Sequence, residues 1–148
     1  MTYRIVVPHD YSPEADLALD WAATLVRSAG GSLVLLHVIL VPAPPIPKLP
    51  MIPALRPVEN PNVSHGMLKE TAAQRGIDAE IALIETSDAG PGIVTRSREL
   101  GADLVVLGGS DPGRSTLSRA IRGSVIDYVV WHASSPVVVV RGGKADSA

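Results

Sequence analysis

The sequence predicts an α/β fold, in which one doubly wound parallel sheet of five strands has the order 3-2-1-4-5. Five short apolar runs alternate with segments of helical periodicity. Ser32 to Ile39 is almost continuously apolar, as expected of a parallel strand buried on both faces. Glycines end the first helical segments, at Gly30, Gly76 and Gly101. Because crossovers between parallel strands are right-handed, this order of elements predicts a doubly wound sheet. We expect a single domain over residues 1–148.

The first strand and helix are predicted from β-branched residues followed by a capping sequence. Tyr3 to Pro8 is typical of a strand. Ser12 is predicted to cap the helix, with Pro13 at its first position and two acidic residues in the first turn. The helix is expected to end at Gly30.

The middle of the chain contains a proline-rich loop, for which we take residues 41–61. Prolines at this density exclude a helix interior or a central strand, so a surface excursion is expected. A short helix should follow from Ser64 to Arg75. Asp78 to Glu85 alternates polar and apolar residues, which predicts a strand at a sheet edge.

The third helix is expected to start after Ser87 or Asp88, either of which could cap it, and to stop at Gly101. The fourth strand is predicted at Leu104 to Leu107.

Ser124 is predicted to cap the last helix, with Asp127 completing a capping box. The apolar run Val137–Val140 is expected to form the fifth strand, at the other sheet edge. Residues 142–148 are expected to be a flexible tail.

Composition excludes several classes of function. The net charge is −2 and no block of like charge occurs, so an extended nucleic-acid surface is not expected. There is no cysteine, and no pair of the four histidines has a metal-ligand spacing, so no metal site is predicted.

The beginning of the chain argues against a membrane role. Its first apolar run is too short for a signal-peptide core or a membrane span. The lack of cysteine is consistent with a reducing compartment, and we expect a cytoplasmic protein.

The candidate site follows from the predicted topology. Ligands of such sheets bind at the carboxyl ends of the strands where the winding reverses, here between the first and fourth strands. One loop there begins with Pro8, His9 and Asp10. The other begins at Gly108 and ends at Gly123. Its backbone N–H groups, and those of a helix starting at Ser124, could meet phosphate oxygens, which predicts a nucleotide-sized anion as ligand.

These motifs resemble the universal stress protein family. Its signature is Gly, two residues, Gly, nine residues, Gly and Ser or Thr. Gly113, nine residues and Gly123-Ser124 match it, and Ser110 stands at the first glycine position. Three further segments resemble the family in the right order: Pro8 to Ser12, Leu35 to Val38, and Trp131 to Arg141.

The resemblance implies an adenine-nucleotide alpha-hydrolase-like fold and a regulatory protein of the stress response that binds ATP with Mg²⁺. Asp10 and Val38 would contact the adenine and ribose. Phosphates would be wrapped by four residues: Gly113, Gly123, Ser124 and Val125. Gly109, Ser110 and Arg114 complete the expected site. The resemblance also implies a homodimer through antiparallel pairing of Val137–Val140.

Two alternatives stay open at this point. Ser110 and Pro112 favour a family member that binds no nucleotide and acts through its dimer surface. Gly123-Ser124 could be a helix cap without a ligand. No nucleophile elbow or P-loop motif is present, so no dedicated enzyme is expected, although slow incidental ATP hydrolysis is left open. His9 is expected to be a solvated loop histidine and His37 a hydrogen-bonded core histidine.

Overall fold

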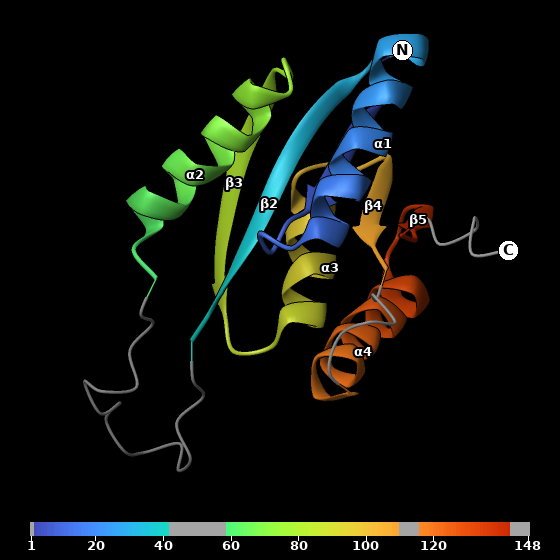
Figure 1. Cartoon of the computed structure of the whole chain (residues 1–148). Coiled ribbons are helices and arrows are strands. Elements are labelled where there is room, and N and C mark those ends of the chain that lie inside the picture. Colours follow the sequence, from blue (N-terminus) through green and yellow to red (C-terminus); the bar gives the residue numbers. More distant parts are fainter. Residues whose placement is uncertain (1, 42–58, 110–115, 143–148) are drawn as a thin grey trace, which may run out of the picture.

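A computed structural model describes residues 2–41, 59–109 and 116–142, with the side chains of 116–122 left out. It contains one parallel five-stranded sheet of order β3-β2-β1-β4-β5, which confirms the predicted class and strand order (Figure 1). The strands are β1 (Arg4–Pro8), β2 (Ser32–Leu40), β3 (Ala79–Thr86), β4 (Leu104–Gly108) and β5 (Val137–Val140). The helices are α1 (Pro13–Ala29), α2 (Pro61–Gln74), α3 (Ala89–Glu99) and α4 (Thr116–His132).

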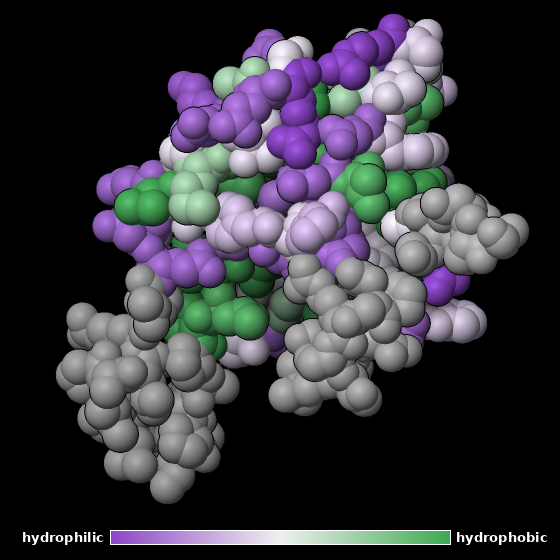
Figure 2. All heavy atoms as spheres, viewed as in Figure 1, coloured by the Kyte–Doolittle hydropathy of each residue, from purple (hydrophilic) through white to green (hydrophobic). Residues whose placement is uncertain are grey.

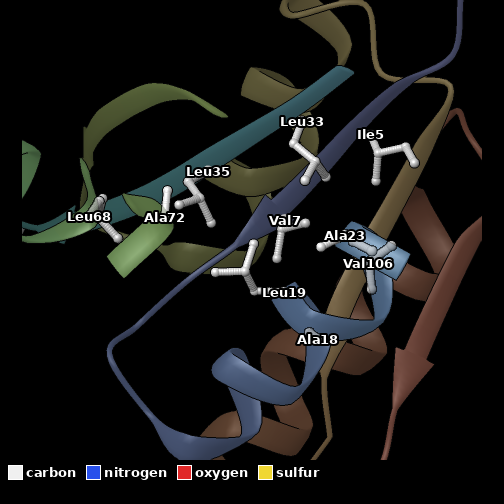
Figure 3. Close-up of a cluster of buried hydrophobic side chains, with 11 residues drawn as sticks. Ile5, Val7, Ala18, Leu19, Ala23, Leu33, Leu35, Leu68, Ala72 and Val106 are labelled. Carbon is white, nitrogen blue, oxygen red and sulfur yellow. The ribbon is translucent and has the colours of Figure 1, made fainter. Parts of the chain in front are cut away.

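Two apolar clusters hold the helices against opposite faces of the sheet. Along β1, Ile5 and Val7 belong to the cluster under α1 and α2, whereas Val6 belongs to the cluster under α3 and α4. This alternation is the period of two that a strand imposes on its side chains. Figure 3 shows the first cluster, in which Leu19 of α1 and Leu68 of α2 lie among the strand residues.

The first helix begins as the sequence predicts. The Ser12 hydroxyl accepts a hydrogen bond from the Ala15 N–H at 3.1 Å, and Pro13 occupies the first turn. Gly30 ends the helix with a φ of 82°, a conformation that glycine adopts without steric cost.

The second helix begins three residues earlier than predicted. Asn60 caps it by accepting the Asn62 N–H at 2.9 Å, and Pro61 sits at its first position rather than in the proline-rich loop. Proline fits there because the first N–H of a helix has no partner within the helix. Residues 42–58 of that loop lie outside the described residues.

The last helix corrects a prediction. It begins at Thr116, so Ser124 lies about two turns inside α4 and is not its N-cap. The intervening sequence contains good helix formers such as Leu117, Arg119 and Ala120. They outweigh the cost of a single interior glycine, Gly123, which is about 1 kcal/mol.

The two edge strands are β3 and β5, as predicted from the alternation in one and the position of the other. Asp88 precedes α3 at the N-cap position but makes no side-chain capping bond. Across the described residues, no helix is long and apolar enough to cross a membrane.

Candidate functional site

A pocket of about 340 Å³ opens at the carboxyl ends of β1, β2 and β4, where the winding of the sheet reverses. This volume is in the range of small-molecule sites. Figure 2 shows apolar surface near the carboxyl end of β2, where Leu40 is 57% exposed. The described lining residues are Pro8, His9, Asp10, Ser12, Ala15, Leu36, Val38, Leu40, Ala89, Ile93, Leu107, Gly108, Val125 and Ile126.

His9 anchors the loop that follows β1. It is 4% exposed, which corrects the prediction of a solvated histidine. Its Nδ1 accepts the Tyr11 N–H at 3.1 Å, so the ring proton lies on Nε2, which donates to Asp16 at 2.9 Å. The main chain of His9 is also bonded, since its N–H donates to Leu36 and its carbonyl accepts from His37. These bonds explain why a loop histidine is buried.

Asp10 follows His9 and is exposed at the pocket rim. Its Oδ1 accepts the Ser12 N–H at 3.1 Å, so the side chain is held by its own turn. Tyr11, which lies between Asp10 and Ser12, has a φ of 65°, which a non-glycine residue rarely adopts. The loop conformation thus places a carboxylate beside the pocket.

His37 of β2 is buried and hydrogen-bonded through both ring nitrogens, as predicted. Nδ1 donates to the His9 carbonyl at 2.7 Å, and Nε2 lies 2.6 Å from a Glu59 carboxylate oxygen. The same Glu59 oxygen accepts the Ser64 hydroxyl of α2 at 3.1 Å. The pocket loop is therefore linked to the start of α2.

The main chain of Val38 faces the pocket. The pairing of β1 with β2 ends at Pro8 and Leu36, whereas β2 continues to Leu40 beside β3. The Leu36 carbonyl points toward β1, where it accepts the His9 N–H. Because backbone groups alternate along a strand, the N–H and C=O of Val38 point to that same side, past the end of β1.

Gly108 and Gly109 differ in their roles at the end of β4. Gly108 lines the pocket, and a Cβ there would overlap the Glu14 carbonyl and lie 2.9 Å from the Ala15 nitrogen. Only glycine lets the first turn of α1 pack so closely. The Gly109 N–H donates to the Val140 carbonyl of β5 at 2.7 Å, and this residue is not among the described lining.

The remaining predicted residues divide into three groups. Val125 lines the pocket from α4. Gly123 and Ser124, also within α4, are not among the described lining residues, and Ser124 is exposed. Ser110, Gly113 and Arg114 lie outside the described residues. The structure thus brings together five predicted residues: Pro8, His9, Asp10, Val38 and Val125.

Sequence reasoning missed most of the apolar wall. Ala89 and Ile93 of α3 line the pocket, as do Leu107 of β4 and Ile126 of α4. The apolar pattern of the sequence predicts that such residues are buried in the core, or predicts no role for them, and does not distinguish a pocket wall. The available signal was position, because α3 starts after a parallel strand and its first turn must lie at the same rim as the two loops.

No group of three or more histidine, aspartate and glutamate side chains arranged to hold a metal occurs among the described residues.

The family model described as "Universal stress protein family" matches residues 1–141. The chain belongs to the universal stress protein family. It is 29% identical over 150 residues to a universal stress protein of Mycolicibacterium smegmatis, covering 95% of this chain. A Na⁺/H⁺ antiporter of Synechocystis is 25% identical over 149 residues, also 95% of this chain. This universal stress protein spans 48% and 19% of the length of those two relatives.

Solved structures share the fold. A universal stress protein in complex with cAMP gives a TM-score of 0.64 at 21% identity, covering 96% of this chain and 98% of that one. An Arabidopsis thaliana family member with AMP bound gives 0.64 at 18%, covering 99% and 95%. An Archaeoglobus fulgidus member in complex with dAMP gives 0.61 at 20%, covering 94% and 97%.

Proposed function

We propose that this universal stress protein binds an adenine nucleotide in the pocket between β1 and β4 and acts as a regulatory binding protein, not as a dedicated enzyme. One observation carries the proposal. The pocket lies where doubly wound sheets bind ligands and combines an apolar wall with the Asp10 carboxylate and the Val38 main chain.

The proposed pose follows from the chemistry of each wall. Adenine would lie among apolar side chains such as Ile93 and Leu107. The Val38 N–H and C=O would pair with a ring nitrogen and the amino group of the base. Asp10 would accept hydrogen bonds from ribose hydroxyls, as acidic residues do in other doubly wound folds.

The solved relatives support an adenine ligand, since those in complex with cAMP, AMP and dAMP all hold the same base. More specifically, we propose that the nucleotide is ATP with Mg²⁺. Its phosphates would extend toward residues 110–115, which include Ser110, Gly113 and Arg114. A role in the stress response and a cytoplasmic location belong to the same proposal.

We also propose a homodimer that forms through β5. This strand is a sheet edge, and its four valines are only half-buried. The Pro136 carbonyl accepts from the Val105 N–H of β4, and the Val140 carbonyl accepts from the Gly109 N–H just after β4. The N–H groups of Val137 and Val139 therefore point to the open side. An open edge pairs readily with its symmetry mate.

Calorimetry with ATP and Mg²⁺ tests the binding proposal, and the ratio of absorbance at 260 and 280 nm reports co-purified nucleotide. Saturable binding below millimolar concentration supports it. No heat and no retained nucleotide at millimolar ATP would leave the second candidate, a protein that acts through its dimer surface. Ser110, at the first glycine position of the signature, favours that candidate.

A further inference from the structure

We propose that His37 and Glu59 share one proton that helps to hold the loop after β1 in place, and that loss of this proton weakens ligand binding in the pocket. The inference rests on the proposed function and names a means of regulating the same site. It would make nucleotide affinity fall as the pH rises through the range in which histidines titrate.

The hydrogen bonds of His37 are the first argument. Its side chain is only 4% exposed, and its ring faces two acceptors. Nδ1 lies 2.7 Å from the His9 carbonyl oxygen, and Nε2 lies 2.6 Å from a carboxylate oxygen of Glu59. A neutral imidazole has a single N–H, whereas the imidazolium has two. Both contacts are therefore hydrogen bonds only when the pair holds one proton more than a neutral ring and an ionised carboxylate.

Loss of that proton forces a choice between the two acceptors. A carboxylate is the stronger one, since hydrogen bonds to ionised groups are about twice as strong as those between neutral groups. The remaining N–H would therefore lie on Nε2 and donate to Glu59, whose same oxygen also accepts the Ser64 hydroxyl at 3.1 Å. Nδ1 would then turn a lone pair toward the His9 carbonyl oxygen, and this contact would become repulsive.

The His9 carbonyl belongs to the loop that forms part of the pocket, since His9 and Asp10 both line it. Two other bonds of His9 do not involve His37: its N–H donates to the Leu36 carbonyl, and its ring contacts Asp16. The loop would thus lose one of its attachments and keep others. We therefore expect a moderate loss of affinity and an intact fold.

The groups packed against the His37 ring come from the loop after β1 and from the residues before α2. The Tyr11 ring lies against it, with centroids 4.5 Å apart. Glu59 is the charged side chain bonded to it within the part of the chain that the structure describes. The proton on this pair therefore depends first on the Glu59 carboxylate.

His9 is a second titratable group in the same loop. Its Nδ1 accepts the Tyr11 N–H, and its Nε2 donates to Asp16, which also lies 3.3 Å from the Arg75 guanidinium. A second proton on the His9 ring would remove the acceptor for the Tyr11 N–H and loosen the loop at low pH. The test therefore compares two proteins that differ only in the partner of His37.

Glu59→Gln is that comparison. The glutamine amide can donate to Nε2 of a neutral His37, and its oxygen can accept the Ser64 hydroxyl. Nδ1 then keeps its proton for the His9 carbonyl at every pH. Calorimetry of the full chain with ATP and Mg²⁺ at pH 6.0 and 9.0 measures both proteins. We expect the ratio of wild-type to variant affinity to fall about fivefold between these pH values, the effect of one hydrogen bond.

The ratio removes the titration of the ligand and of the other histidines. Glu70→Gln, on the exposed side of α2, removes a carboxylate distant from His37 in sequence and should keep the wild-type pH dependence. A ratio that is constant with pH overturns the inference while the proposed function stands. If wild-type protein binds no nucleotide at millimolar concentration at either pH, the proposed function fails and this inference fails with it.

Nitrogen NMR of histidine-labelled protein without ligand gives a second readout. At pH 6.0 we expect protons on both ring nitrogens of His37. At pH 9.0 the single proton should lie on Nε2 in the wild type and on Nδ1 in Glu59→Gln. A wild-type His37 that carries its proton on Nδ1 at pH 9.0 would contradict the proposed release of the His9 carbonyl.

Discussion

The Nε2 of His9 lies 2.9 Å from the Oδ1 of Asp16, and this bond fastens the pocket loop to the first turn of α1. The same carboxylate oxygen lies 3.3 Å from the Arg75 guanidinium at the end of α2. Asp10 directly follows His9, which is held by Asp16 of α1, and Asp16 is in turn held by Arg75 at the end of α2. These contacts tie the loop after β1 to both α1 and α2.

Replacing His9 should destabilise the protein more than replacing an exposed histidine. His9→Ala removes partly buried hydrogen bonds to Asp16 and Tyr11, which should lower the free energy of unfolding by about 1–3 kcal/mol. His65→Ala, on the exposed side of α2, should change it by less than about 0.5 kcal/mol. Urea unfolding followed by circular dichroism measures both. Equal midpoints for the two variants would show that the His9 bonds contribute little.

Two glycine substitutions should have opposite effects. Gly108→Ala forces a Cβ into the backbone of Glu14 and Ala15, and should destabilise by about 1–3 kcal/mol. Gly123→Ala adds a methyl group in open space within α4, and should stabilise by about 0.5–1 kcal/mol. Thermal unfolding of the pair separates these outcomes. A stabilised Gly108→Ala would mean that α1 does not pack on β4 as described.

Asp10→Asn should weaken binding of adenine nucleotides about tenfold, or about 1.4 kcal/mol, because the charged acceptor at the rim is lost. Asparagine keeps an oxygen for the Ser12 N–H, so the loop should keep its conformation. Glu70→Gln makes the same change of charge on the exposed side of α2 and should leave binding unchanged. Calorimetry measures all three proteins. An Asp10→Asn variant with wild-type affinity would remove this carboxylate from the proposed pose.

A bulky side chain in the pocket wall should abolish binding without unfolding the protein. Val125 lines the pocket and is half-buried, so Val125→Trp should fill part of the cavity. Val130→Trp places the same side chain at an exposed position of the same helix and serves as control. Ligand titration with circular dichroism of each variant checks this. Wild-type affinity in Val125→Trp would mean that the ligand lies elsewhere.

Proline at position 139 should disrupt the proposed homodimer. The Val139 N–H points to the open side of β5, so Val139→Pro removes an outward donor and spares the pairing with β4. We expect a monomer by size-exclusion chromatography with light scattering. Val139→Thr keeps the N–H and should keep the dimer. A wild-type protein that elutes as a monomer would refute the interface directly.

The sequence was most informative where local chemistry decides the structure. Ser12 and Pro13 fixed the start of α1, and the alternation in Asp78 to Glu85 identified an edge strand. It was less informative where long-range packing decides. The Gly123-Ser124 pair does not itself show that the helix extends back to Thr116, because such a pair is compatible with a helix cap and with a helix interior.

The burial of His9 also depends on partners distant in sequence. Leu36 and His37 lie on another strand and bond the main chain of His9, whereas Asp16, which bonds its ring, is only seven residues away. The apolar pocket wall was hidden for a related reason. A side chain such as Ile93 has the same periodicity whether it faces the core or a cavity beside the core.

The strands β1 and β2 differ in length, and this step in the sheet exposes the main chain of Val38. Every residue type except proline, which lacks the N–H, offers both a main-chain donor and a main-chain acceptor. Base recognition by such an edge would survive replacement of the valine side chain by alanine or threonine. A site of this kind does not depend on which side chains are present. Its specificity comes from the different lengths of two neighbouring strands.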